Sequence, residues 1–209
     1  MKKLTVLAAL VLLLVVGCSK KADYWPLTVG NTWDYTGTAI TTHSDTLLNP
    51  DTTTGTMNME ITSEVTLTNG DPAFQQIMTQ TFGSYTSAET SYVAEVGDYV
   101  LSYGALSDTD PDTMIVNPLE AGASWTVESD SGYTQKAYVI AQEDLTVPAD
   151  TYNDAWKILW VSVDGATVDT TTVYFAPNVG LVKMMMTESN PMDTTTTNIT
   201  IELEDVNIK

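Results

Sequence analysis

An alternation of apolar and polar side chains constrains the fold of this chain more than any other feature. Along residues 57–68, Met and aliphatic side chains alternate with Asn, Glu and Thr. The pattern returns where Ile199, Ile201 and Leu203 alternate with Thr and Glu. A helix would scatter these apolar residues around its axis, whereas a strand places them on one face. The sequence therefore predicts strands with one buried and one solvated face.

Turn dipeptides separate the strand-like segments. They are Asn69-Gly70, Gly97-Asp98, Ser131-Gly132 and Asp164-Gly165. Gly supplies the positive φ of tight hairpin turns, and connections this short make neighbouring strands antiparallel. No stretch reads as an amphipathic helix. We expect strands at residues 33–40, 57–68, 73–82, 89–96, 99–103, 124–130, 133–142, 155–163, 167–175, 179–187 and 197–206.

The expected architecture is all-β: a twisted antiparallel meander that curls into a half-barrel or open barrel. Open sheets of more than about ten strands usually curl or split, which favours curvature over a flat sheet. A β-sandwich of two packed sheets is the alternative.

An internal repeat suggests that the fold is built from a duplicated β unit. Pro26-Leu27-x-x-Gly30-x-x-Trp33 recurs as Pro118-Leu119-x-x-Gly122-x-x-Trp125. The repeat divides the β domain, 26–209, into halves 26–117 and 118–209. The alternative is that Pro, Gly and Trp simply form a common entry into a strand.

The N-terminal segment has the pattern of a lipoprotein signal peptide. Lys2 and Lys3 precede an apolar run over residues 4–16, too short to span a bilayer comfortably. The run ends at Gly17-Cys18, which resembles the lipobox of bacterial lipoproteins. That resemblance implies a cleaved signal peptide at 1–17 and acylation of Cys18, palmitate included. Residues 18–25 would then form the lipidated tether to a membrane of the cell envelope. We expect the outer membrane, with the periplasmic or surface face open.

Charge and residue content exclude several classes of function. The chain has 27 acidic residues against 8 basic ones, and removal of Lys2 and Lys3 would take the net charge from −19 to about −21. Binding to nucleic acid needs a cationic surface, so we expect no nucleic-acid partner. His43 is the lone histidine and Cys18 the lone cysteine, so zinc chemistry and a Ser-His-Asp site are disfavoured. We expect no cofactor and no enzymatic activity.

Acidic residues leave two weaker hypotheses open. Asp108, Asp110 and Asp112 alternate as Ca²⁺ ligands do, but the glycine and the closing glutamate of a calcium loop are absent, so an acidic surface loop is favoured. A hydrolase with a carboxylate pair stays possible, since only geometry identifies such a pair. Asp-Thr triads resembling Bacteroidetes O-glycosylation sites begin at Asp45, Asp51, Asp112, Asp169 and Asp193.

Three segments resemble an uncharacterised family of bacterial lipoproteins related to the TapB-like proteins. They are Tyr24-Trp25-Pro26-Leu27 with Gly30, Trp33 and Tyr35; Val147-Pro148-Ala149-Asp150-Thr151-Tyr152; and residues 174–183. The resemblance implies an antiparallel β architecture and no known activity. Asp150 and Asn178 stand where the family usually has Gly. Both residue types tolerate the left-handed region, so we expect turns with positive φ at both positions.

Taken together, the sequence predicts a membrane-anchored envelope lipoprotein with a non-enzymatic binding or scaffolding role, whose partner is an unidentified envelope protein or glycan. A carrier of a hydrophobic or lipid ligand is the first alternative, and a carboxylate-dependent hydrolase the second. Trp156, Ile158 and Trp160 share one face of a strand and are the candidate ligand-binding residues. We expect the interior to be mostly filled by side chains, with at most a shallow groove.

Overall fold

The structure, a computed structural model, describes residues 22–43, 49–190 and 195–209. Within these ranges the chain forms twelve antiparallel strands and no helix, which confirms the all-β prediction. Cys18 and the predicted signal peptide lie outside the described residues. The strands are β1 (Thr32–His43), β2 (Asp51–Thr66), β3 (Pro72–Phe82), β4 (Tyr85–Val96), β5 (Tyr99–Tyr103), β6 (Asp112–Val116), β7 (Ser124–Asp130), β8 (Tyr133–Thr146), β9 (Thr151–Asp164), β10 (Thr167–Ala176), β11 (Gly180–Asn190) and β12 (Thr195–Asn207).

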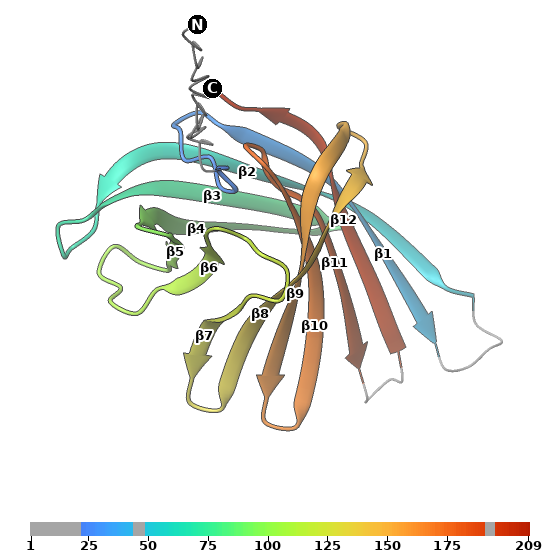
Figure 1. Cartoon of the computed structure of the whole chain (residues 1–209). Helices are drawn as coiled ribbons and strands as arrows, with labels where there is room; N and C mark the ends of the chain where they lie inside the picture. Colours follow the sequence, from blue (N-terminus) through green and yellow to red (C-terminus); the bar gives the residue numbers. More distant parts are fainter. Residues whose placement is uncertain (1–21, 44–48, 191–194) are drawn as a thin grey trace, which may run out of the picture.

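All twelve strands belong to one curled sheet, so the two-sheet sandwich alternative is wrong (Figure 1). The spatial order is β6-β5-β4-β3-β2-β1-β12-β11-β10-β9-β8-β7. Two meanders, β1–β6 and β7–β12, are joined by the antiparallel pairing of β1 with β12. β6 and β7 stand at the two edges of the sheet. The result is a nearly closed barrel-like sheet with one unsealed seam.

The sequence prediction missed one strand and shortened several others. β6 was not expected, because its five residues follow Pro111 and an acidic stretch that is typical of a loop. β2 begins at Asp51, six residues before the predicted start, and β4 begins at Tyr85. Thr-rich and Ser-rich ends of these strands carry little apolar alternation, so the period-two signal fades before the strand ends.

The predicted hairpin turns are confirmed. Gly70, Gly97, Gly132 and Gly165 all have positive φ, at 95°, 64°, 89° and 57°. Each lies between two paired strands, so glycine supplies the left-handed backbone that these tight connections need.

The prediction of positive φ at two non-glycine positions is half right. Asn178 has φ of 59° in the turn between β10 and β11, as expected. Asp150 does not have positive φ, and the expectation for it is wrong. The backbone N–H of Val147 donates to the carbonyl of Asp150 at 3.0 Å, so Asp150 closes that turn rather than occupying its centre. The second left-handed residue is instead Asp154, also at 59°.

The two copies of the repeated motif build the same turn. Gly30 and Gly122 have φ of 85° and 86°. The N–H of Gly30 donates to the carbonyl of Ile61 on β2 at 2.7 Å, and that of Gly122 donates to Val139 on β8 at 2.9 Å. Each copy therefore ties the entrance of a six-stranded meander to its second strand. Duplication of an ancestral unit stays a prediction.

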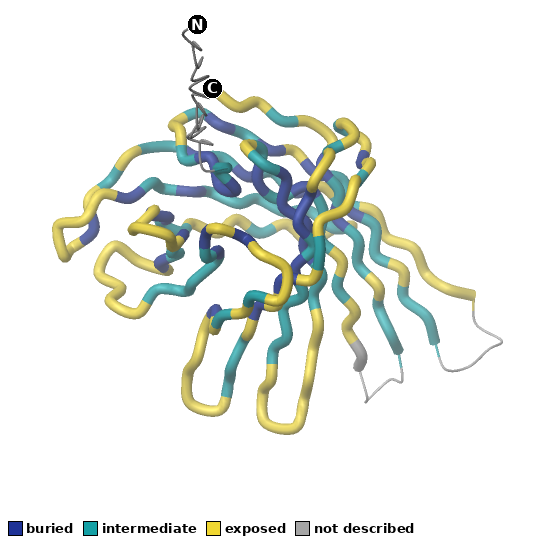
Figure 2. Tube along the Cα trace, viewed as in Figure 1, coloured by how far each residue is buried: buried dark blue, intermediate teal, exposed yellow. Residues whose placement is uncertain are grey.

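The core lies toward one end of the barrel, where the segment before β1 plugs the opening (Figure 2). Tyr24 and Trp25 are each 7% exposed. The indole N–H of Trp25 donates to Gln76 Oε1 on β3 at 3.0 Å, and that of Trp156 on β9 donates to the Tyr24 hydroxyl at 3.0 Å. The plug thus binds opposite walls of the barrel, and we refer to this end as the plugged end.

The segments that resemble the lipoprotein family meet at the plugged end. The N–H of Asn178 donates to the carbonyl of Asp23 at 2.6 Å, which links the β10–β11 turn to the segment before β1. The N–H of Ala149 donates to the carbonyl of Leu203 on β12 at 3.0 Å. These motifs therefore act in folding, by closing one end of the barrel.

Candidate binding site at the open end of the barrel

The inner face of the barrel changes from packed core to open groove along β11 and β12. Val182 and Leu203 are fully buried near the plugged end. Two residues further along each strand, Met184 lies opposite Ile201, and Met186 then lies opposite Ile199. Because side chains alternate along a strand, these residues share the inner face with the core but lie nearer the opposite, open end.

These side chains line a hollow of about 590 Å³ at the open end. Its volume is within the range of about 300–1,000 Å³ that is usual for small-molecule sites. Apolar side chains from β1, β3, β4, β11 and β12 dominate its lining, together with Thr53, Gln80 and Glu188. The lining residues are Ala39, Thr53, Gln80, Phe82, Tyr85, Met184, Met186, Glu188, Ile199 and Ile201.

Two glycines shape the inner wall beside the hollow. Gly37 on β1 pairs with Gly55 on β2, which pairs with Phe82 on β3. A Cβ added at either glycine would overlap the Phe82 ring, so the ring lies flat over bare backbone. The absence of two side chains lets Phe82 sit low in the wall, which keeps the open end wide.

Polar groups replace the apolar lining at the mouth of the hollow. The Thr41 and Thr197 hydroxyls, paired across β1 and β12, are 2.9 Å apart. His43 Nε2 and Asp51 Oδ2 are 3.2 Å apart at the ends of β1 and β2. The inner surface therefore runs from a closed core through an apolar groove to a polar rim.

The predicted ligand residues lie on the inner face, but none of them lines the hollow. Trp156 and Ile158 belong to the packed core. Trp160 packs against the core, and it lies in the cross-strand row that continues through Thr171 to Met186. Its buried indole N–H has no hydrogen-bond partner among the described residues. Their role in ligand binding stays a prediction.

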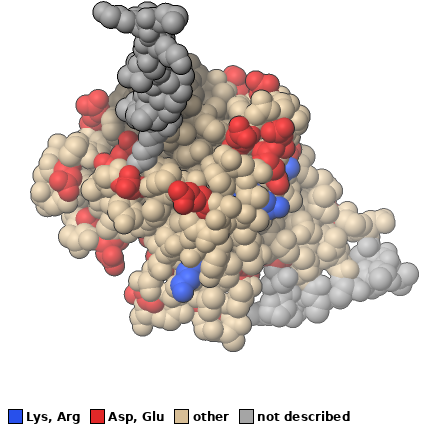
Figure 3. All heavy atoms as spheres, viewed as in Figure 1, with Lys and Arg blue, Asp and Glu red and all other residues tan. Residues whose placement is uncertain are grey.

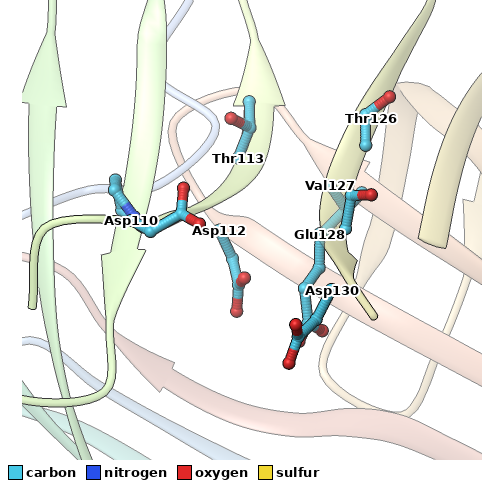
Figure 4. A pocket seen from close by; sticks show the side chains of 9 residues that line it. Asp110, Asp112, Thr113, Thr126, Val127, Glu128 and Asp130 are labelled. Carbon is cyan, nitrogen blue, oxygen red and sulfur yellow. The ribbon is translucent and has the colours of Figure 1, made fainter. Parts of the chain in front are cut away.

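A second hollow, of about 380 Å³, lies in the seam between β6 and β7 (Figure 4). Asp110 and Asp112 line one side, and Glu128 and Asp130 line the other. The indole N–H of Trp125 on β7 bridges the seam to the carbonyl of Thr113 on β6 at 2.9 Å.

The seam raises the pKa of one carboxyl group. Partial burial of Asp112, followed by the negative charges of Glu128, Asp108 and Asp110, raises the pKa of Asp112 from 3.8 to about 6. Both causes disfavour the charged form, because the group loses water and gains like-charged neighbours. Asp112 therefore changes charge in a pH range where ordinary carboxylates are already ionised.

The three aspartates considered as a calcium loop, Asp108, Asp110 and Asp112, are not grouped together in this arrangement. Among the described residues, no three His, Cys, Asp or Glu side chains are grouped closely enough to hold a metal ion. Asp108 Oδ2 instead accepts a hydrogen bond from the N–H of Gly104 at 3.1 Å. Asp112 is the first residue of β6 rather than part of a loop. No helix in the described ranges is long and apolar enough to cross a membrane.

Only some of the triads proposed for glycosylation lie within the described residues. Asp51 begins β2 and is exposed, Asp112 begins β6, and Asp169 is exposed on β10. The triad at Asp45 lies outside the described residues, as does the start of the one at Asp193.

Sequence reasoning missed the groove residues. Met184 and Met186 stand in a run of three methionines, where Met185 faces outward and is 42% exposed, so no alternation is visible. Phe82 ends the strand predicted at residues 73–82, next to Gly83, and nothing local marks it as part of a cavity. The one usable signal was Ile199 and Ile201, whose alternation was recognised as a strand but not as a wall of a cavity.

Comparisons with known proteins find the same architecture elsewhere. A candidate lipoprotein from Parabacteroides distasonis has a crystal structure that matches with a TM-score of 0.50 at 15% identity, covering 90% of this chain and 99% of that one. This likeness shows the fold. A candidate exported protein from Bacteroides fragilis, described as having a YmcC-like fold, matches with a TM-score of 0.49 at 13% identity, covering 89% and 99%.

No protein-family model matches the chain, and no curated protein matches it significantly. The TapB-like resemblance therefore stays a prediction.

Proposed function

We propose that this protein is a non-enzymatic envelope lipoprotein that binds an apolar ligand at the open end of its barrel. The sequence suggested two non-enzymatic roles, ligand binding and scaffolding. The geometry favours ligand binding in a half-barrel over scaffolding alone. The lipid on Cys18 would hold the plugged end toward the outer membrane, because the tether enters the barrel there.

Two observations support a location in the cell envelope. The segment ending at Gly17-Cys18 resembles a lipobox, and the two solved structures are described as a candidate lipoprotein and a candidate exported protein. Their identity to this chain is low, so their descriptions suggest the cell envelope without naming a task.

The observation that carries the binding role is the uneven filling of the barrel. Trp33, Tyr35 and Phe175 are fully buried at the plugged end, whereas the open end keeps a hollow lined by Met, Ile and Phe. A structural scaffold gains stability from filling such space, since unfilled apolar volume weakens a core. Methionine side chains also adapt to ligands of different shape.

Two neighbouring methionines give a matched test. We would measure binding of a neutral, uncharged fluorescent probe whose emission rises in apolar surroundings. Met186→Gln should weaken saturable binding about tenfold or more, because Met186 lines the hollow. Met185→Gln, on the outward face of the same strand, should leave it unchanged. Absence of saturable binding, or equal effects of both substitutions, would favour the scaffold.

One observation favours a second candidate, the carboxylate-dependent hydrolase. The seam places a carboxyl group with raised pKa, Asp112, opposite a second acidic side chain, Glu128, as acid and base pairs require. Against it, no aromatic side chain lines that hollow to hold a sugar ring. Turnover of chromogenic glycosides or esters that is lost in Asp112→Asn would establish this activity in place of simple binding.

A further inference from the structure

The cationic side chains of the described residues avoid the inner face of the barrel. Lys136, Lys157 and Lys183 each neighbour a fully buried inward residue in the sequence, so they point outward from β8, β9 and β11. Lys157 lies over the ring of Tyr174 at 5.7 Å, and Lys183 binds Glu202 at 2.7 Å. Figure 3 shows how few cations stand among the acidic groups on the face in view.

Lys209, the remaining lysine of the described ranges, belongs to the plugged end, where its backbone N–H donates to Asn31 Oδ1 at 3.0 Å. No lysine of the described residues therefore lines the hollow.

Carboxylates, in contrast, stand at the open end. Glu188 lines the hollow directly, one inward position beyond Met186. Glu89, opposite Met78, also faces inward, but it is not among the residues that line the hollow. His43 could supply positive charge at the mouth, but it is bound to Asp51, which already matches that charge.

We infer that the groove takes the single apolar chain of an amphiphile with a cationic head group. The inference deepens the proposed function and rests on it. The alkyl chain would lie against Met184, Met186 and Ile199, and the head group would lie near Glu188. The hydroxyls of Thr41 and Thr197 would add neutral hydrogen-bonding groups at the polar rim.

Charge complementarity selects this class over a fatty acid. A carboxylate head group at the mouth would meet Glu188 with no lysine of the described residues to offset the repulsion. An ammonium head group would gain from the same charge. Glu188 is exposed, so solvent screens the interaction and limits it to a preference of roughly tenfold rather than absolute selection.

Photo-crosslinking tests the inference on the full chain in its own membrane. Two probes would carry the same dodecyl chain with a diazirine at mid-chain, one ending in an ammonium and the other in a carboxylate. Crosslinked peptides would be located by mass spectrometry. We expect labelling of β11 and β12 peptides, with about a tenfold preference for the ammonium probe.

Three variants separate local charge from the acidity of the whole chain. Glu188→Gln should reduce the preference to about threefold or less, and Glu188→Lys should reverse it. Glu204→Gln removes an exposed carboxylate from the outer face of β12 and should change nothing. Melting temperatures would confirm that each variant is folded.

The outcomes distinguish the two levels of the hypothesis. If neither probe labels the groove peptides, both the proposed function and this inference fail. If the carboxylate probe labels them equally or better, the groove binds apolar chains but the head-group assignment is wrong. A preference that survives in Glu188→Lys would also overturn the assignment, since the general acidity of the chain would then be its cause.

Discussion

Asp112→Asn should stabilise the protein at neutral pH and have little effect at acid pH. In the folded chain, burial and neighbouring carboxylates raise the pKa of Asp112 from 3.8 to about 6. The folded state therefore holds the proton more tightly than the unfolded state. The group contributes most to stability below about pH 4, and that contribution is lost as the pH rises to about 6 and above. Asparagine mimics the protonated form at every pH.

The size of the effect follows from the shift and from solvent exposure. A shift of about two pH units corresponds to roughly 3 kcal/mol, since each unit is worth about 1.4 kcal/mol. Asp112 is only partly buried, so water and salt screen much of that energy. We expect a gain of about 1 kcal/mol at pH 7.5, or about 2–4 °C in melting temperature for a chain of this size.

Urea denaturation between pH 4 and pH 8 measures the prediction. The useful quantity is the difference between Asp112→Asn and the unsubstituted chain at each pH, because other carboxylates titrate in both. Asp169→Asn, which removes an exposed carboxylate on β10, controls for the loss of one charge. A difference that is the same at pH 4 and pH 7.5, or a gain equal to that of the control, would refute the reasoning.

Three further predictions concern other parts of the chain. Asn178→Gly should leave urea stability unchanged, whereas Asn178→Val should cost more than about 1 kcal/mol, because φ is positive there. Trp33→Phe should lower the melting temperature more than Trp160→Phe, because only the Trp33 indole loses a hydrogen bond, at 2.6 Å to the carbonyl of Val179. Cys18→Ala should abolish metabolic labelling with a fatty-acid analogue and release the chain from membranes or leave an uncleaved precursor.

Local features of the fold were predictable from the sequence. Strand alternation and glycine turns depend on neighbouring residues, and the positive φ at Gly70 and Asn178 follows from backbone sterics. Asp150 shows the limit of this reasoning. The family resemblance pointed to a turn, but which residue of the turn is left-handed depends on the hydrogen bond between Val147 and Asp150.

The site depended on contacts that are distant in sequence. Phe82 covers Gly37 and Gly55 only because β1, β2 and β3 pair in one particular register. The Asn69-Gly70 turn helps to set the register of β2 against β3, but the longer connection from β1 to β2 leaves their register open, and a slip of one residue would turn every side chain to the other face. The seam carboxylates came together for the same reason, since Asp112 and Glu128 belong to different meanders.

We trace the failure of β6 and β7 to pair across the seam to particular side chains. If the halves 26–117 and 118–209 descend from one unit, the contact of β6 with β7 is the counterpart of the pairing of β12 with β1. β1 pairs with β12 along the whole length of β1. Toward the open end of the barrel, Thr41 on β1 lies opposite Thr197 on β12, and their hydroxyls are in contact.

At the seam, β6 has five residues and β7 has seven, and acidic side chains stand on both edges. Extending the ladder would bring Asp112 and Glu128 together on adjacent strands, where like charges destabilise a pair. The Trp125 bond to Thr113 can hold the edges near each other without that pairing. Strand number therefore does not prevent closure, because the same topology closes at β1 and β12. We attribute the open seam between β6 and β7 to the short edge strands and to the carboxylates that face each other across it.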